Sequence, residues 1–144
     1  MIEIKQIKYS NRSYSGINKY LFKVLINNNV TLPKNLFITL TDGWQSTHIF
    51  EAEEEKICLI TLNLIELLKL YKRKEYLNRG FNDKITFKQF LVFVLYHELA
   101  HYQKHFYNTN IEKDKTKKEA QADYYAMNLW REVYFDDKNI YSST

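Results

Sequence analysis

The chain has 144 residues, of which 45% are hydrophobic, and this size and composition favour one folded domain over residues 1–144 with a core of its own. Its one cysteine, Cys58, excludes an internal disulfide framework and a zinc cluster built from cysteines. The formal net charge of +4 leaves a nucleic-acid partner open, although most of the basic residues are dispersed along the chain.

The distribution of apolar residues argues against export and against a membrane span. The first residues lack the basic and then apolar layout of a signal peptide. The longest apolar run, from Phe90 to Tyr96, is too short to cross a bilayer. We therefore expect a cytoplasmic protein that does not use a membrane as a partner.

The first half of the chain is expected to alternate between strands and a helix. Isoleucines at positions 2, 4 and 7 suggest a short opening strand, and an apolar face with a period of three to four residues predicts a helix that starts at Ser15. Strands are expected at 36–41, 44–51 and 56–62, with Asp42-Gly43 as a turn. These segments predict a small, mainly antiparallel sheet, in which 56–62 would be the edge able to bind an extended peptide.

The second half of the chain is expected to be helical. One amphipathic helix is predicted over 62–78, ending near Gly80. The sequence Thr86-Phe87-Lys88-Gln89 has the form of a capping box, so the next helix should begin there and run through the apolar residues 90–96. A last helix is expected from about residue 117 to 134. The predicted fold class is α+β.

The central motif is His97-Glu98-Leu99-Ala100-His101, an HExxH sequence on the predicted buried helix. Residues at i and i+4 lie on one face of a helix, so both imidazoles can bind one metal ion. Glu98 lies beside them, able to contact water without being a ligand itself. This arrangement is typical of zinc-dependent peptidases, in which the glutamate is the general base.

A catalytic zinc ion usually has three protein ligands, and the best candidate for the third is Glu119. Asp123 follows it at i+4 and can orient a ligand histidine, His97 in the first place. Two alternatives stay open. Glu119 would instead close a capping box with Thr116, or His105 would be the third ligand. Histidines at 97, 101 and 105 span about 12 Å on a straight helix, so His105 requires a break after His101.

The two motifs together resemble the signature of the gluzincin peptidases, HExxH followed by Glu-x-x-(Ala/Ser)-(Asp/Asn). Here the second motif is Glu119-Ala120-Gln121-Ala122-Asp123. Within that clan the chain is most similar to the small ImmA/IrrE-type proteins and the single-domain minigluzincins, over about residues 86–130. It departs from the ImmA/IrrE pattern at Gln121, where Glu is frequent, and at Asp123, where Asn is frequent.

The resemblance implies a zincin-like fold with an N-terminal helix, a small mainly antiparallel sheet, and a buried HExxH helix packed against a C-terminal helix that carries the glutamate ligand. It also implies a zinc metalloendopeptidase that hydrolyses proteins or peptides with a zinc-activated water and Glu98 as general base. Tyr124, Tyr125 and His48 are candidates for the donor that stabilises the transition state.

Two other functions stay open at this point. One is a non-catalytic binding or regulatory protein that keeps the zincin fold. The other is a peptidase similar to the SprT group that acts on proteins bound to nucleic acid, which the net positive charge favours.

Overall fold

The computed structural model of the chain describes residues 4–9, 14–27, 32, 35–42, 47–52, 57–81, 85–107 and 115–134. Within these ranges the protein is α+β, as predicted. Its elements follow in the order β1 (Ile4–Tyr9), α1 (Ser15–Asn27), β2 (Asn35–Thr41), β3 (His48–Ala52), β4 (Ile57–Asn63), α2 (Leu64–Lys72), the 3-10 helix η2 (Glu75–Arg79), α3 (Phe87–Tyr107) and α4 (Lys115–Val133). In the described part of the chain, no helix is both long and apolar enough to cross a membrane.

The four strands form one sheet in the order β1-β2-β4-β3. The prediction of a mainly antiparallel sheet is wrong, because β1 pairs with β2 and β2 pairs with β4 in parallel, and only β3 and β4 are antiparallel. Helix α1 carries the chain from β1 back to the start of β2, which makes that pair parallel. The chain then places β3 beyond the position of β4, and β4 returns between β2 and β3.

This strand order also corrects the expected sheet edge. The strand predicted at 56–62 is β4, whose backbone pairs with β2 on one side and β3 on the other, so it cannot accept an added strand. The edges of the described sheet are β1 and β3 instead, and β3 is the edge that contacts α3. Strand β3 starts at His48, and residues 44–46 of the strand predicted there lie outside the described residues.

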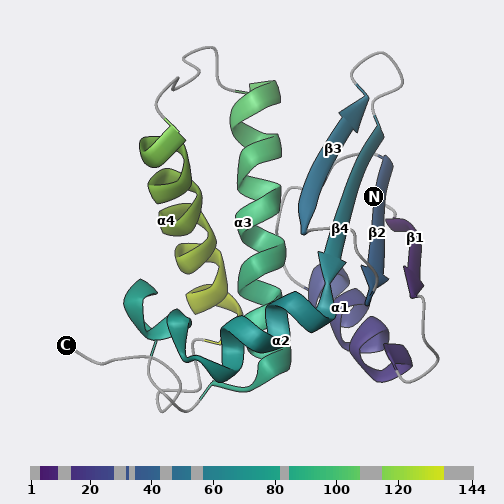
Figure 1. Ribbon diagram of the computed structural model, residues 1–144. Coiled ribbons are helices and arrows are strands. Elements are labelled where there is room, and N and C mark those ends of the chain that lie inside the picture. The colour runs from purple at the N-terminus through teal and green to yellow at the C-terminus, as the bar shows by residue number, and fades with distance from the viewer. Residues whose placement is uncertain are drawn as a thin grey trace.

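The helices bury one side of the sheet. Alternate residues of β2 are buried, namely Leu36, Ile38 and Leu40. Helix α3 contacts β3 and β4 as well as the three helices α1, α2 and α4. In Figure 1, α3 and α4 stand side by side and run in opposite directions, with β3 as the strand nearest to them and α2 below. The helix of the HExxH motif therefore lies between the sheet and α4.

The helix predicted over 62–78 is interrupted. Helix α2 ends at Lys72, and Lys74 adopts a left-handed conformation with φ 57° before η2 begins at Glu75. Gly80, with φ 97°, then ends η2 in a left-handed conformation that glycine adopts more readily than other residues do. This break turns η2 back toward α3, where Tyr76 is buried and stacks on Tyr71 with 5.3 Å between the ring centroids.

The start of α3 is fixed by two sets of hydrogen bonds. The predicted capping box is confirmed, since the backbone N–H of Gln89 donates to Thr86 Oγ1 over 3.1 Å and the backbone N–H of Thr86 donates to Gln89 Oε1 over 2.8 Å. The indole N–H of the fully buried Trp130 on α4 donates to the Gln89 carbonyl over 2.8 Å. The capping box thus fixes where α3 begins, and the indole bond fixes this first turn relative to α4, about two turns before the HExxH motif.

Candidate metal centre and adjoining cavity

Three side chains from two helices converge where α3 and α4 face each other. His97 and His101 come from successive turns of α3, and Glu119 comes from the first turns of α4. His97 Nε2 lies 3.3 Å from His101 Nε2 and 2.8 Å from Glu119 Oε2, while His101 Nε2 lies 3.4 Å from Glu119 Oε1. One ligand atom from each residue falls within 4.8 Å of the others, so the group can hold a metal ion.

The close approach of α4 depends on small side chains. Ala122 and Ala126 are both fully buried, one turn apart, on the side of α4 that also carries Trp130. Residues without bulk at these positions let the two helices pack closely enough for the Glu119 carboxylate to reach both imidazoles.

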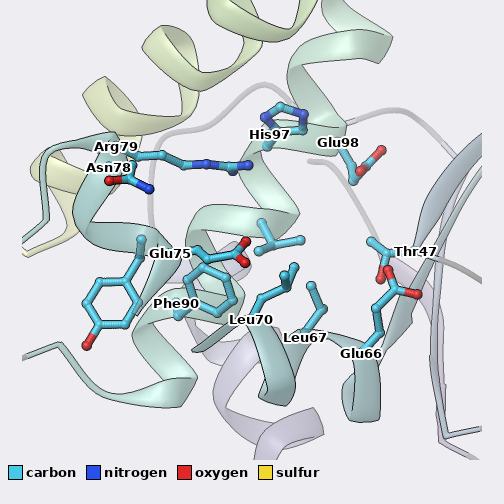
Figure 2. A pocket seen from close by; sticks show the side chains of 12 residues that line it. Thr47, Glu66, Leu67, Leu70, Glu75, Asn78, Arg79, Phe90, His97 and Glu98 are labelled. Atoms are coloured by element: carbon cyan, nitrogen blue, oxygen red, sulfur yellow. The ribbon is translucent and has the colours of Figure 1, made fainter. Parts of the chain in front are cut away.

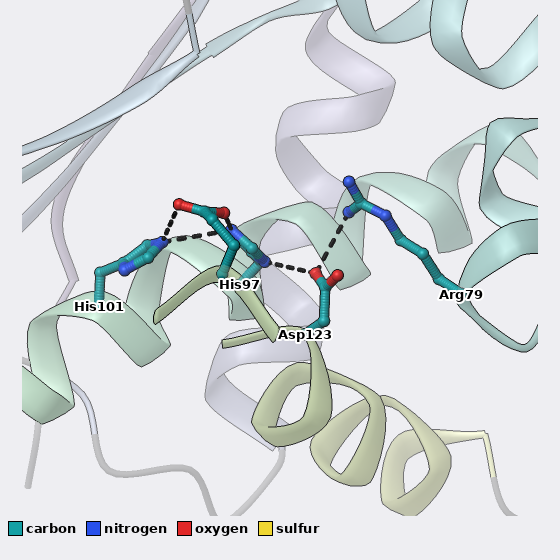
Figure 3. A network of polar contacts seen from close by, with 5 residues as sticks. Arg79, His97, His101 and Asp123 are labelled. Atoms are coloured by element: carbon teal, nitrogen blue, oxygen red, sulfur yellow. Dashed lines mark hydrogen bonds and ion pairs between the residues drawn. The ribbon is translucent and has the colours of Figure 1, made fainter. Parts of the chain in front are cut away.

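The second nitrogen of His97 is oriented by Asp123. His97 Nδ1 lies 2.7 Å from Asp123 Oδ1, a hydrogen bond in which the ring N–H donates, and this leaves Nε2 directed at the other two side chains. The same carboxylate oxygen accepts from Arg79 Nη1 over 3.3 Å. Figure 3 shows this chain from Arg79 through Asp123 to His97 and His101.

The two histidines have opposite electrostatic surroundings. Burial by itself lowers the pKa of His97, but the hydrogen bond and charge of Asp123, followed by the charges of Glu119 and Glu98, raise it above its usual value. Burial and the charge of His97 lower the pKa of His101, against the opposing effect of Glu119. The carboxylates of Asp123, Glu119 and Glu98 thus stabilise positive charge at His97, whether a proton or a metal ion carries it.

The donor set and its spacing fit a zinc ion. Imidazole nitrogen and carboxylate oxygen are both common zinc ligands, and two ligand atoms each about 2.1 Å from a tetrahedral zinc ion lie about 3.4 Å apart. The Nε2–Nε2 distance of 3.3 Å and the His101–Glu119 distance of 3.4 Å agree with that value, whereas the 2.8 Å between His97 Nε2 and Glu119 Oε2 is a hydrogen-bond distance that would lengthen around a metal ion. His97, His101 and Glu119 are therefore the residues that would hold the metal.

A cavity of about 300 Å³ opens beside this cluster, between α3, α2 and η2. His97 and Glu98 lie at one end of it, as Figure 2 shows. Apolar side chains from α2, η2 and α3 form much of the lining, namely Leu67, Leu70, Tyr76, Phe90 and Val94. The remaining lining residues are polar or charged, namely Thr47, Glu66, Glu75, Asn78 and Arg79. The Glu98 side chain therefore faces a space that a substrate can enter.

The other sequence candidates fall elsewhere. Tyr124 is 73% exposed, Tyr125 is partly buried, and neither is among the described residues that line the cavity. The side chains of His48 and His105 lie outside the described residues. The backbone of α3 continues without a break to Tyr107, which is the geometry that argued against His105 as a ligand. Helix α4 begins at Lys115, one residue before the expected cap Thr116.

Sequence reasoning missed Arg79 and the two cavity glutamates Glu66 and Glu75. Glu66 and Glu75 lie in the segment 62–78 that was expected to be one continuous helix, and Arg79 follows it directly; charged residues there are ordinary solvent-facing positions. Their common cavity exists because the chain breaks at Lys74 and η2 folds back on α3. No proline or glycine at this point of the sequence indicates the break.

Comparisons with known protein families, with curated proteins and with solved structures find no match to this chain.

Proposed function

We propose that the protein is a zinc-dependent peptidase whose metal is held by His97, His101 and Glu119. The observation that carries the proposal is the convergence of these three side chains at distances that suit one zinc ion, beside a cavity that Glu98 faces. A structural zinc site is closed by four protein ligands, whereas a catalytic site keeps a position for water. Among the described residues three ligands lie next to an open cavity, which favours the catalytic kind.

The proposed chemistry assigns one task to each side chain. Zinc, when bound, supplies a Lewis acid that lowers the pKa of water to about 7. Glu98 takes the proton of the attacking water and passes it to the departing amine, which is general acid–base catalysis by a carboxylate next to, and not within, the ligand set. Asp123 keeps His97 in the tautomer that presents Nε2 to the metal.

Substrate binding is proposed to use the sheet edge. Among the described strands β3 pairs with β4 alone, it contacts α3, and Thr47 directly before it lines the cavity. An extended peptide hydrogen-bonded to β3 would therefore pass next to Glu98. The mixed sheet, the buried HExxH helix and the glutamate-bearing α4 also support the finer assignment of a zincin-like fold.

The substitution Glu98→Gln tests the proposal. It keeps the size of the side chain and all three proposed ligands but removes the base, so peptide hydrolysis should fall by about 10²- to 10⁴-fold while zinc content stays unchanged. Hydrolysis would be measured by mass spectrometry on a mixture of unstructured peptides incubated with zinc-loaded protein. Equal hydrolysis by the variant would contradict the role of Glu98 as the base. No hydrolysis by the zinc-loaded parent protein would contradict the peptidase proposal and favour a binding function for the fold.

A further inference from the structure

The cavity beside the candidate metal centre has the lining of a side-chain pocket. Its volume of about 300 Å³ is at the lower end of the range for small-ligand pockets, so it suits one amino-acid side chain better than a whole cofactor. Leu67, Leu70, Phe90 and Val94 give it an apolar wall. The stem of a long side chain would remove this surface from water.

Two carboxylates flank that apolar wall. Glu66 belongs to the first turn of α2 and Glu75 to the first turn of η2. In Figure 2, Glu66 lies on the side of Thr47 and Glu98, and Glu75 lies on the side of Phe90 and Arg79, with Leu70 and Leu67 between them. Among the described residues neither carboxylate has an ion-pair partner.

Arg79, the one permanently charged cation among the described lining residues, is already engaged. Arg79 pairs with Asp123 over 3.3 Å, and its guanidinium carbon lies 5.7 Å from the centre of the Phe93 ring. The charge of Arg79 is balanced by Asp123, so Glu66 and Glu75 leave an excess of negative charge in the lining even without Glu98. Such a lining attracts a cationic group and repels a carboxylate.

We propose that this cavity binds a lysine or arginine side chain of the substrate, with the apolar stem over Leu67 and Leu70 and the charged head between Glu66 and Glu75. Its description as a substrate pocket rests on the proposed peptidase function. The occupant would be held by a peptide whose scissile bond lies at the metal centre, so the pocket would select peptides with a basic residue close to that bond. The alternative is that the cavity binds an apolar or an acidic side chain, and the experiment distinguishes these from a basic one.

The experiment measures binding rather than turnover. Zinc-loaded Glu98→Gln protein is titrated with fluorescent hexapeptides in which a single Lys, Met or Glu is moved through each position of an otherwise uncharged sequence. Met matches the length and the apolar stem of Lys without its charge. At one position Lys should bind about threefold to tenfold more tightly than Met, with Glu weakest, and the difference should shrink at high salt.

Charge removal in the cavity provides the second arm. Glu66→Gln combined with Glu75→Gln should abolish the preference for Lys over Met. Glu132→Gln, the same chemical change at an exposed position of α4 away from the cavity, should leave the preference intact. Thermal unfolding of each variant checks that the fold is retained.

The outcomes separate the two proposals. A Lys preference that disappears in the double variant supports the pocket, even if the parent protein cleaves no peptide, in which case the peptidase function fails and the pocket stands. Cleavage of peptides without any Lys preference in binding overturns the pocket and leaves the peptidase function. Tightest binding of Met or Glu, or a Lys preference that persists in the double variant, also overturns it.

Discussion

The two halves of α3 differ in almost every physical respect although they belong to one helix. Residues 90–96 are all buried apolar or aromatic side chains, and the half is closed at its start by the capping box and the Trp130 hydrogen bond. The turn from His97 to His101 instead gathers imidazoles and carboxylates within hydrogen-bonding distance of one another. One half stabilises the fold, and the other presents the proposed metal ligands.

This difference means that stability and metal binding should be separable. Apolar burial gives the first half its free energy, whereas the second half holds polar groups that gain little from burial unless a cation joins them. The packed half nevertheless determines where the proposed ligands lie, because a helix is rigid and the position of one turn fixes that of the next. Substitutions in the two halves should therefore have different signatures.

The largest stability effect should come from the packed half. Trp130→Ala removes the largest fully buried side chain among the described residues and its hydrogen bond to Gln89, so the free energy of unfolding should fall by about 3–5 kcal/mol. Urea unfolding would measure this. The fraction that remains folded should still take up zinc. Phe22→Ala, at an exposed position of α1, serves as the control and should lower the free energy of unfolding only slightly.

Substitution of Asp123 should weaken metal binding while lowering the free energy of unfolding much less than Trp130→Ala does. Asp123→Ala removes the acceptor for His97 Nδ1, and zinc affinity should fall by about 10- to 100-fold. Asp123→Asn keeps an acceptor oxygen and should lose less zinc affinity than Asp123→Ala. Competition with a chromogenic chelator would measure both. If the Ala variant bound zinc as tightly as the parent, Asp123 would have no orienting role.

The smallest effect should come from the capping box. Thr86→Ala removes one of its two hydrogen bonds and should lower the free energy of unfolding by about 1 kcal/mol, with zinc affinity unchanged. Urea unfolding and zinc titration on the same preparation would show both. A loss of zinc as large as that in Asp123→Ala would mean that the two halves of α3 are not separable.

Local patterns in the sequence predicted the parts of the structure that depend on neighbours along the chain. The Thr86–Gln89 box starts α3, and the spacing of four residues brings His97 and His101 to one face. On α4, the same spacing places Glu119 and Asp123 together against His97. Each of these depends on helix geometry alone, which a periodic sequence determines.

The sequence did not predict the features that depend on residues distant in the chain. Sheet order depends on where β3 lies relative to β4, and the sequence that joins them carries no such information. The break at Lys74 places a lysine at positive φ, where glycine would be the usual marker. The cavity and the contact between Arg79 and Asp123 follow from that break, so neither could be predicted without it.

The most direct test of the central claim is the zinc content of the purified protein, measured by elemental mass spectrometry for the parent chain and for Glu119→Ala. With His97, His101 and Glu119 as the ligands, the parent should hold close to one zinc ion per chain and the variant much less, with both equally folded by circular dichroism. A parent chain that binds no zinc even after reconstitution, or a variant that keeps all of it, would contradict the proposed metal centre.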